Sequence, residues 1–543
     1  MNEHAATRPN GQSRWVVPDE AMLARLADEV MRGLASEGPA TAAAPTATEA
    51  TEATRATAAA QPSQVQPDQD QPDQDQPIRM TPDPVDRPAS TSGQESDQAV
   101  RAYEAPHPSR PPSFYFIDER PEFDPAAGPG TAIGTGVPGF AVEAVRKDFP
   151  ILGERVNGRP LVWFDNAATT HKPQSVIDRI AYFYGHENSN IHRGAHTLAA
   201  RATDAYEDAR STVARYIGAP RADDIVFTRG TTESINLVAS SWGGTHVGPG
   251  DEIVVSHLEH HANIVPWQRL ADATGALLKV IPVDDDGQVL LDGLGAVLSR
   301  RTKLVAIAHV SNVLGTVVPV EQVIAMAHQA GARVLVDGAQ AVAHLPVQVS
   351  ALDADFYVFS GHKVFGPTGI GALYAKPELL DEMPPWQSGG NMIADVTFER
   401  TRYQQPPAKF EAGTGNIAGA VGLGAALAYV TKLGLPAIAA YEHQLHEYAT
   451  RQITAVPGLR LVGTAAPKAS VLTFTLEGHQ AQDIGTELDR QGIAVRAGHH
   501  CAQPILRRYG LADAVRPSLA LYNTCAEVDQ LVAALHRMAA NGH

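Results

Sequence analysis

The chain has 543 residues, with 60 acidic side chains against 43 Lys and Arg side chains and a net charge of −17. Such a length predicts two or three structural units, and the acidic balance argues against binding nucleic acid or an anionic membrane through a general basic field. Two cysteines form no disulfide framework, and no stretch has the roughly 18 consecutive apolar residues of a membrane-spanning helix. We therefore expect a soluble cytoplasmic protein.

Residues 1–140 have the composition of an extension and not of a folded domain. Their start lacks the apolar core of a signal peptide. Residues 36–112 carry too little apolar surface to offset the entropy of the chain, so we expect the extension to be largely disordered. Two apolar islands interrupt it, a helical pattern over about 18–35 and an aromatic cluster over about 113–124. Each island is either local structure that folds back on the domain or a docking motif that becomes ordered on a partner.

The pattern of a folded α/β protein begins near residue 141. Short β-rich runs such as DIVFT, EIVVS, LVAIAHV, RVLVD and DFYVFS alternate with helical stretches such as ESINLVASSW and EQVIAMAHQAG. This alternation predicts right-handed crossovers and a mainly parallel sheet covered by helices on both faces. Near residue 400 the pattern changes to a long helix, GAVGLGAALAYVTKLG, followed by short strands. We predict a large domain over 141–400, then a linking helix and a small α+β domain over 401–543, with 141–160 able to pack on the small domain.

Polar side chains follow three of the predicted strands, where open α/β sheets gather their functional residues. Thr231 and Thr232 follow DIVFT and open a helix, as a phosphate site requires, although such turns are often plain helix caps. Asp337 ends RVLVD, with Gln340 three residues on, and a carboxylate there could equally cap the next helix. Lys363 follows an apolar strand and precedes a Gly/Pro loop, where burial would lower the pKa of its amine. An anion site, an acid and an amine together are what pyridoxal phosphate needs.

The two cysteines differ in their surroundings. Cys501 lies in RAGHHCAQP, a polar and cationic stretch that favours a reactive thiolate over an inert buried thiol. Cys525 lies in NTCAEVDQL, where Thr524 and Glu527 form a capping-box pattern, so it is interpreted as a first-turn helix residue.

A metal site is the alternative that HLEHHANIVPW raises. His257 and His261 are four residues apart with Glu259 between them, but the spacing matches neither common zinc-helix motif, and we assign no metal. A histidine at a strand end could instead lie flat on the cofactor ring or make structural hydrogen bonds.

At these residues the chain resembles the group II, SufS-type, pyridoxal-phosphate cysteine desulfurases, within the fold-type I (aminotransferase class V-like) superfamily. The matching stretches cover about residues 145–540 and include FDNAATTHKP, NIHRGAHTLA, FTRGTTESINLVA, SGHKVFGPTGIG, FEAGTGN and RPSLALYNT. The resemblance implies a mainly parallel seven-stranded sheet in the large domain and a small C-terminal domain. It also implies that the chain works as a homodimer.

The resemblance implies a role for each residue around the cofactor ring. Lys363 would hold the cofactor aldehyde and carry the Cα proton of the substrate. Asp337 would pair with the pyridine nitrogen, Gln340 with the phenolic oxygen, and His260 would stack on the ring. The residues that it implies for the cofactor phosphate are Thr231, Thr232, Ser360, His362 and, from the second subunit, Thr414.

The remaining roles concern the substrate, L-cysteine. Asn312 and Arg516 would hold its carboxylate, and Arg193 and Arg496 would line the pocket. Cys501 would attack the substrate sulfur, leaving alanine and a persulfide that an acceptor protein or thiol collects.

The extension of about 140 residues departs from the usual members of this family. It resembles the extensions of cysteine desulfurases that are loaded into encapsulin shells, which implies a cargo protein of such a nanocompartment. Three alternatives stay open: a selenocysteine lyase on the same scaffold, an ordinary cytosolic enzyme that supplies iron–sulfur cluster assembly and, more distantly, a non-catalytic binding scaffold.

Overall fold

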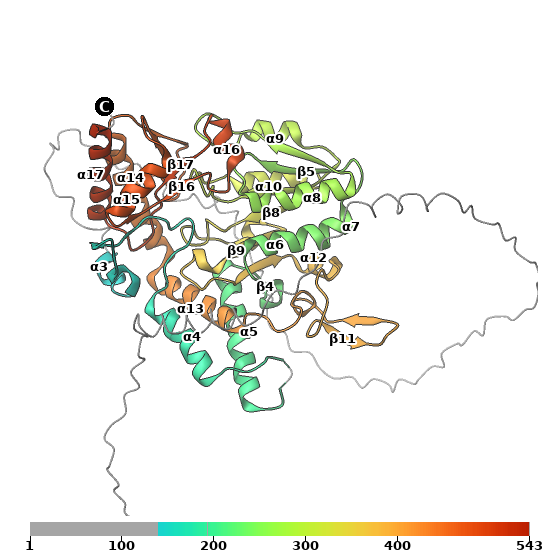
Figure 1. Cartoon of the computed structure of the whole chain (residues 1–543). Coiled ribbons are helices and arrows are strands. Elements are labelled where there is room, and N and C mark those ends of the chain that lie inside the picture. Colours follow the sequence, from blue (N-terminus) through green and yellow to red (C-terminus); the bar gives the residue numbers. More distant parts are fainter. Residues whose placement is uncertain (1–139, 193, 542–543) are drawn as a thin grey trace, which may run out of the picture. The chain divides into compact units, whose positions relative to one another are not determined.

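The computed structural model describes residues 140–192 and 194–541 (Figure 1). Residues 1–139 of the predicted extension, with its islands at 18–35 and 113–124, lie outside the described residues. Within the described part, no single helix is long and apolar enough to cross a membrane, although the bent pair α13 (Ile417–Leu433) and α14 (Leu435–Thr454) reaches that length and composition together. A bend of 75° separates these two helices.

A seven-stranded sheet forms the centre of the large domain, as predicted. Its strand order is β4-β10-β9-β8-β7-β5-β6, and all pairings are parallel except the two made by β10. The strands are β4 (Ile225–Thr228), β5 (Glu252–Ser256), β6 (Leu277–Ile281), β7 (Thr302–Ala308), β8 (Arg333–Asp337), β9 (Phe356–Ser360) and β10 (Gly371–Ala375). The prediction of a mainly parallel sheet is thus confirmed.

The sheet is covered on both faces, which explains why its strands are continuous apolar runs. In β5, Ile253 and Val255 pack in one apolar cluster with Trp267, whereas Val254 packs in the other cluster with Val323. These partners come from α8 (Val265–Thr274) and α10 (Val320–Gln329). The other long helices of this domain are α4 (Gln174–His186), α5 (Thr197–Ile217) and α6 (Thr231–Val238). The helix predicted over 233–242 differs at its end, because a π-helical turn, η3 (Ala239–Gly243), continues α6.

The C-terminal residues form a second, antiparallel sheet of order β13-β14-β17-β16. Its strands are β13 (Leu459–Leu461), β14 (Phe474–Leu476), β16 (Arg496–Gly498) and β17 (Ala514–Arg516), accompanied by helices α15 (Ala481–Arg490), α16 (Gln503–Arg508) and α17 (Cys525–Asn541). Thr524 and Glu527 cap α17 reciprocally through the hydrogen bonds Thr524 N to Glu527 Oε2 (3.0 Å) and Glu527 N to Thr524 Oγ1 (3.3 Å). The predicted capping box is therefore confirmed, and Cys525 is the first residue of the helix.

The first described residues return to this C-terminal part. β3 (Val162–Trp163) pairs in parallel with β15 (Ile493–Ala494), and Arg146 of α3 (Val142–Arg146) makes an ion pair of 2.9 Å with Glu527. The helix α13 packs against α4 and α5. The domain boundaries at residues 140 and 400 remain predictions.

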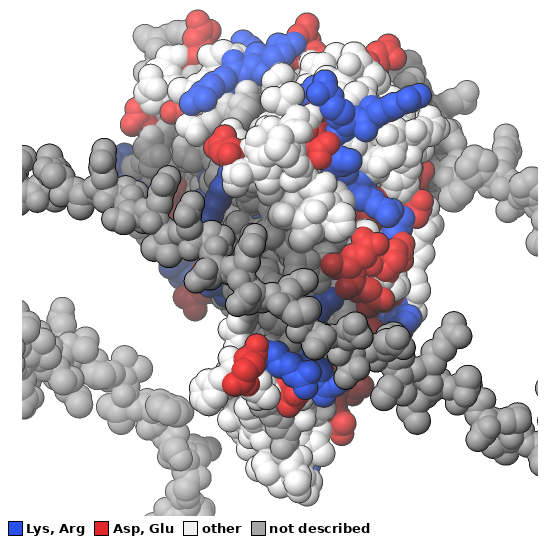
Figure 2. Space-filling view, turned by 90° about the vertical axis from the view of Figure 1, so that its right-hand side faces the viewer, with Lys and Arg blue, Asp and Glu red and all other residues white. Residues whose placement is uncertain are grey.

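The short elements complete the chain. They are η1 (Pro150–Gly153), β1 (Arg155–Val156), β2 (Arg159–Pro160), η2 (Ala222–Asp224), α7 (Gly244–His246), η4 (His261–Asn263), α9 (Leu291–Val297), α11 (Val349–Leu352), η5 (Gly361–Lys363), α12 (Pro377–Glu382), β11 (Ile393–Val396), β12 (Thr401–Tyr403) and η6 (Ala408–Phe410). On the face shown in Figure 2, Lys and Arg side chains are interleaved with Asp and Glu side chains, and neither sign covers the face alone.

A glycine in β10 lets the antiparallel strand approach the end of β4. A Cβ at Gly371 would lie 2.5 Å from Gly230 Cα and 2.5 Å from Phe359 O, both backbone atoms. We expect Gly371→Ala to lower the free energy of unfolding by about 1–3 kcal/mol, the usual cost of forcing extra atoms into a packed site. Denaturant unfolding measures this. The control is Gly153→Ala, whose Cβ would meet nothing within 4 Å; equal stability of the two variants would contradict the prediction.

Candidate active site

A cavity of about 560 Å³ lies where the carboxyl ends of the central strands face the C-terminal antiparallel sheet. All the predicted site residues except Arg193 and Thr414 line it: Thr231, Thr232, His260, Asn312, Asp337, Gln340, Ser360, His362, Lys363, Arg496, Cys501 and Arg516. Arg193 lies outside the described residues. Thr414 is exposed in the loop before α13 and contacts Asn190 of its own chain (3.5 Å). The fold thus gathers residues from position 231 to position 516 around one space.

Lys363 lies three residues beyond the end of β9, in the short helix η5. Burial lowers the pKa of its amine to about 8, against the opposing attraction of Asp337. An amine with this pKa is partly neutral near physiological pH, so it can attack an aldehyde or accept a proton.

Asp337 is the last residue of β8 and is buried. One of its oxygens accepts a hydrogen bond from Ala339 N (2.9 Å), and burial raises the pKa of the carboxyl. Gln340 is also buried and donates its side-chain amide to Ala167 O (2.7 Å). A carboxyl and an amide are therefore fixed side by side on one wall of the cavity.

The start of α6 forms an anion cradle with the end of β9. Thr231 N donates to Ser360 Oγ (2.9 Å), and the two hydroxyl groups are 2.8 Å apart. Gly230 precedes the helix with a φ of 149°, and a Cβ there would lie 3.1 Å from Ser360 Oγ. The first turn of a helix offers free N–H groups to an anion, and Thr232 and His362 also line this part of the cavity.

His260 begins the turn that follows β5. Its Nδ1 accepts a hydrogen bond from Ala262 N (3.0 Å). Burial, and secondarily the charge of Lys363, lower the pKa of the ring to about 3. The imidazole is therefore neutral, with its proton on Nε2.

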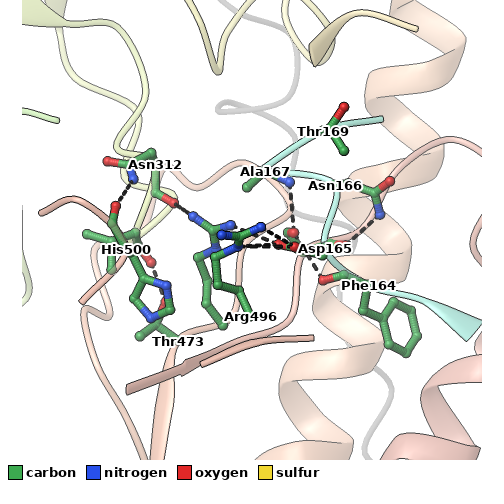
Figure 3. Close-up of polar contacts among 12 residues, drawn as sticks. Phe164, Asp165, Asn166, Ala167, Thr169, Asn312, Thr473, Arg496 and His500 are labelled. Carbon is green, nitrogen blue, oxygen red and sulfur yellow. Dashed lines mark hydrogen bonds and ion pairs between the residues drawn. The ribbon is translucent and has the colours of Figure 1, made fainter. Parts of the chain in front are cut away.

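Two guanidinium groups that line the cavity, those of Arg496 and Arg516, share one carboxylate, that of Asp165 (Figure 3). Arg496 Nε and Nη2 donate to it at 3.1 and 2.8 Å, and Arg516 Nη2 donates at 3.1 Å. Arg516 Nη1 also donates to Asn312 O (2.9 Å). Two buried polar atoms, Arg516 Nε and Asn312 Oδ1, have no hydrogen-bond partner among the described residues. Such a pair of a donor and an acceptor suits the carboxylate and ammonium ends of an amino acid.

Asp165 was not among the predicted site residues, although it follows the short strand β3 in FDNAATT. The signal was the same as for Asp337, an acid at a strand end, but two residues of strand were too few to identify it. His499 and His500, the two histidines of the stretch RAGHHCAQP, also line the cavity and were not among the predicted site residues.

Cys501 is exposed on the loop between β16 and α16, and its backbone has a positive φ of 52°. Cys501 N donates to Nδ1 of His499 (3.1 Å), and the adjacent His500 is buried, with its carbonyl accepting from Asn312 Nδ2 (2.8 Å). The thiol thus belongs to a loop that is attached to the cavity wall but open to solvent.

The acid of the HLEHH stretch, Glu259, makes structural hydrogen bonds. Glu259 is buried and accepts from Ser256 Oγ (2.6 Å), Asn263 Nδ2 (2.6 Å) and Ala308 N (3.1 Å). Over residues 140–192 and 194–541, no group of three or more His, Cys, Asp or Glu side chains could hold a metal ion.

The donor set fits pyridoxal phosphate. The cradle of Thr231 and Ser360 suits its phosphate, Asp337 its pyridine nitrogen, and Lys363 its aldehyde. These groups come from three different strand ends, so the fit is a property of the fold and not of one motif.

Comparison with known sequences agrees with this assignment. The model of the aminotransferase class-V family matches residues 162–531. A probable cysteine desulfurase of Mycolicibacterium paratuberculosis is 64% identical over 403 residues, which are 74% of this chain and 59% of that protein. A cysteine desulfurase of Synechococcus elongatus is 61% identical over 442 residues, 78% of this chain and 71% of that protein. The chain therefore spans less than two thirds of the first relative's length.

Solved structures show the same architecture. The apo structure of a cysteine desulfurase from Thermococcus onnurineus NA1 matches with a TM-score of 0.70 at 39% identity, over 74% of this chain and 98% of that one. A C-DES mutant with glycine covalently linked to its PLP cofactor matches with a TM-score of 0.63 at 25% identity, over 72% and 98% of the two chains.

Removal of the shared carboxylate tests the arginine pair. We expect Asp165→Asn to lower the free energy of unfolding by about 3 kcal/mol, because the buried Arg516 then loses its ionic partner while Arg496 stays close. Denaturant unfolding measures the change. The matched control is Asp223→Asn, which breaks an exposed ion pair with Arg221 (2.6 Å) and should cost less than about 1 kcal/mol. A similar decrease in the free energy of unfolding in both variants would show that Asp165 stabilises the protein no more than an exposed ion pair does.

The pKa of Lys363 predicts how the amine reacts with pyridoxal phosphate. Only the neutral amine is nucleophilic, so attachment should accelerate as the pH rises through about 8 and level off above it, whereas an ordinary lysine would need about pH 10.4. Borohydride trapping followed by mass spectrometry of the peptide measures the rate. Lys363→Ala should show no trapping at this peptide, and a rate that still climbs past pH 10 would refute the lowered pKa.

Proposed function

Because this chain belongs to the aminotransferase class-V family and, within it, to the cysteine desulfurases, we propose that it converts L-cysteine to L-alanine and keeps the sulfur as a persulfide on Cys501. The observation that carries the proposal is the meeting of an amine of lowered pKa, Lys363, and a solvent-open thiol, Cys501, in one cavity. The enzyme is dependent on pyridoxal phosphate, in accord with its family.

The cavity first binds the amino acid by its charged ends. Arg516 is held flat by its bonds to Asp165 and Asn312 O, which leaves Nε for the substrate carboxylate. Asn312 was expected to hold the same carboxylate, but its Nδ2 donates to His500 O. The atom left without a partner among the described residues is the acceptor Oδ1, which suits the substrate ammonium and not its carboxylate. An arginine suits this task better than a lysine because its planar fork keeps one orientation while it contacts several oxygens.

Lys363 then removes the proton from the substrate Cα. When bound, pyridoxal phosphate supplies the electron sink that makes this proton acidic. The amine is neutral above about pH 8, so it takes the proton and returns it to the product side. His260 is neutral with its proton on Nε2, so it can donate that hydrogen bond inside the cavity without adding a charge.

Cys501 finishes the reaction as a nucleophile. Its Sγ forms an S–S bond with the substrate sulfur while the substrate C–S bond breaks, and the electron pair of that bond goes to the carbon skeleton that leaves as alanine. The reaction is balanced: L-cysteine and the Cys501 thiol give L-alanine and a persulfide on Cys501. No external oxidant is needed for this step.

The proposal extends to the fate of the sulfur and to the oligomer. The persulfide passes to an acceptor protein or thiol, and the chain acts as a homodimer in which Thr414 of each subunit serves the phosphate site of the other. The exposure of Thr414 and of Cys501 supports both parts.

The two cysteines provide a matched test of the nucleophile. We expect Cys501→Ala to lower alanine formation from L-cysteine by at least about a thousand-fold, as loss of a nucleophile does, while Cys525→Ala keeps wild-type turnover. Alanine is quantified in the presence of a thiol reductant. Turnover of selenocysteine that survives in Cys501→Ala, with cysteine turnover also intact, would favour a lyase and end the proposed mechanism.

We also propose that residues 1–140 direct the enzyme into an encapsulin shell. This part rests on the resemblance of the extension to those of encapsulin cargo proteins. The enzyme is then cytoplasmic and enclosed in such a shell. Deletion of residues 1–139 should leave alanine formation within about twofold of the full chain, because the lining residues that the structure describes all lie at position 167 or later. The same deletion should abolish co-sedimentation with a co-expressed shell protein. A truncated enzyme that is still packaged would remove the cargo role and leave the desulfurase untouched.

A further inference from the structure

The loop that carries Cys501 has an uncommon backbone. His500 and Cys501 both have positive φ angles, 54° and 52°, in the left-handed region that residues with a side chain rarely adopt. Two such residues in succession persist only when neighbouring groups hold them. The contacts that hold this loop therefore decide where the thiol lies.

One residue outside the loop contacts it on both sides of the thiol. His261 N donates to Cys501 O (2.8 Å), and His261 Nε2 accepts from Gln503 N (3.3 Å). The ring of His261 also stacks on that of His499 (5.8 Å between centroids, 27°), whose Nδ1 accepts from Cys501 N. Asn312 supplies the other contact from the large domain, at His500 O.

His261 is itself fixed by the turn to which it belongs. Glu259 ties this turn to β5 and β7 through Ser256 and Ala308, and Asn263 joins it to Trp267 Nε1 (2.9 Å). The residue between Glu259 and His261 is His260, which faces the cavity. One rigid turn therefore presents one histidine to the cofactor side and the next histidine to the thiol loop.

We propose that His261 is a positioning residue that sets Cys501 at the right place against the cavity, by accepting the Gln503 N–H bond and holding the Cys501 carbonyl. The inference rests on the proposed function, since it assigns a task to the thiol. Burial, His499 and Arg507 lower the pKa of His261, so the ring keeps the lone pair on Nε2 at neutral pH.

A matched pair of substitutions separates the acceptor from the bulk of the side chain. His261→Gln keeps an amide acceptor, whereas His261→Met has nearly the same size and shape without a strong one. Both keep the backbone N–H that binds Cys501 O. His261→Phe, which keeps the ring against His499, is a second variant without an acceptor in case the Met protein does not fold.

The experiment compares two reactions of the holoenzyme. Exchange of the Cα proton of L-alanine in D₂O, followed by NMR, needs Lys363 but not Cys501. Alanine formation from L-cysteine needs both. We expect His261→Met to lower alanine formation at least about tenfold with exchange unchanged, as a small misplacement of a reacting group does, and His261→Gln to stay near wild type. Hydrogen exchange of the backbone amides of 501–503 should be at least about tenfold faster in His261→Met only.

Three outcomes would decide whether His261 positions Cys501. A selective loss in His261→Met that His261→Gln rescues supports the inference. Equal loss of both reactions would show a general structural role and overturn it, and unchanged reactions with unchanged hydrogen exchange would overturn it too. Failure of the wild type to form alanine would instead reject the proposed function, and the hydrogen exchange of the loop would still report whether His261 holds it.

Discussion

The arrangement of the site depends on the hydrogen bonds that the carboxylate of Asp165 accepts from two arginines. Asp165 lies just after β3 and accepts hydrogen bonds from Arg496 and Arg516, which come from β16 and β17 of the C-terminal sheet. Without this charge the buried guanidinium of Arg516 would have no ionic partner and would lie close to a second, half-exposed guanidinium, that of Arg496. One acid therefore holds two cations of the C-terminal sheet beside the cavity, and one of them, Arg516, donates in turn to Asn312 O of the large domain.

Desolvation is the second constraint, and it acts on Lys363, His260 and Asp337, which lie at or just beyond strand ends. Burial lowers the pKa of Lys363 to about 8 and that of His260 to about 3, and it raises the pKa of the Asp337 carboxyl. Each group is moved toward its neutral form, so the amine becomes a usable base and the imidazole keeps a single donor. Cys501 contrasts with these buried groups, since its side chain is exposed to solvent.

The sequence predicted the elements that are local in character. The apolar runs from DIVFT to DFYVFS became β4, β5, β7, β8 and β9, because buried parallel strands are continuous in hydrophobicity. The rule that function follows the carboxyl ends of strands selected Asp337 and Lys363 without further help. The boundaries were less well predicted: β7 ends at Ala308, two residues before the apolar run LVAIAHV ends, and α6 passes into a π-helical turn that no local pattern announced.

By itself the sequence determined the α/β class and the capping box that makes Cys525 the first residue of a helix, since these follow from residue types and their immediate neighbours. Only the tertiary structure decided the partners of the site residues. Asp165 is separated from Arg496 by 331 positions and from Arg516 by 351, and His261 contacts a loop that begins more than two hundred residues later. Local pattern encodes how a segment of backbone folds, but a hydrogen bond between distant segments exists only after the sheet order and the packing of the C-terminal sheet have brought them within 3 Å or so of each other.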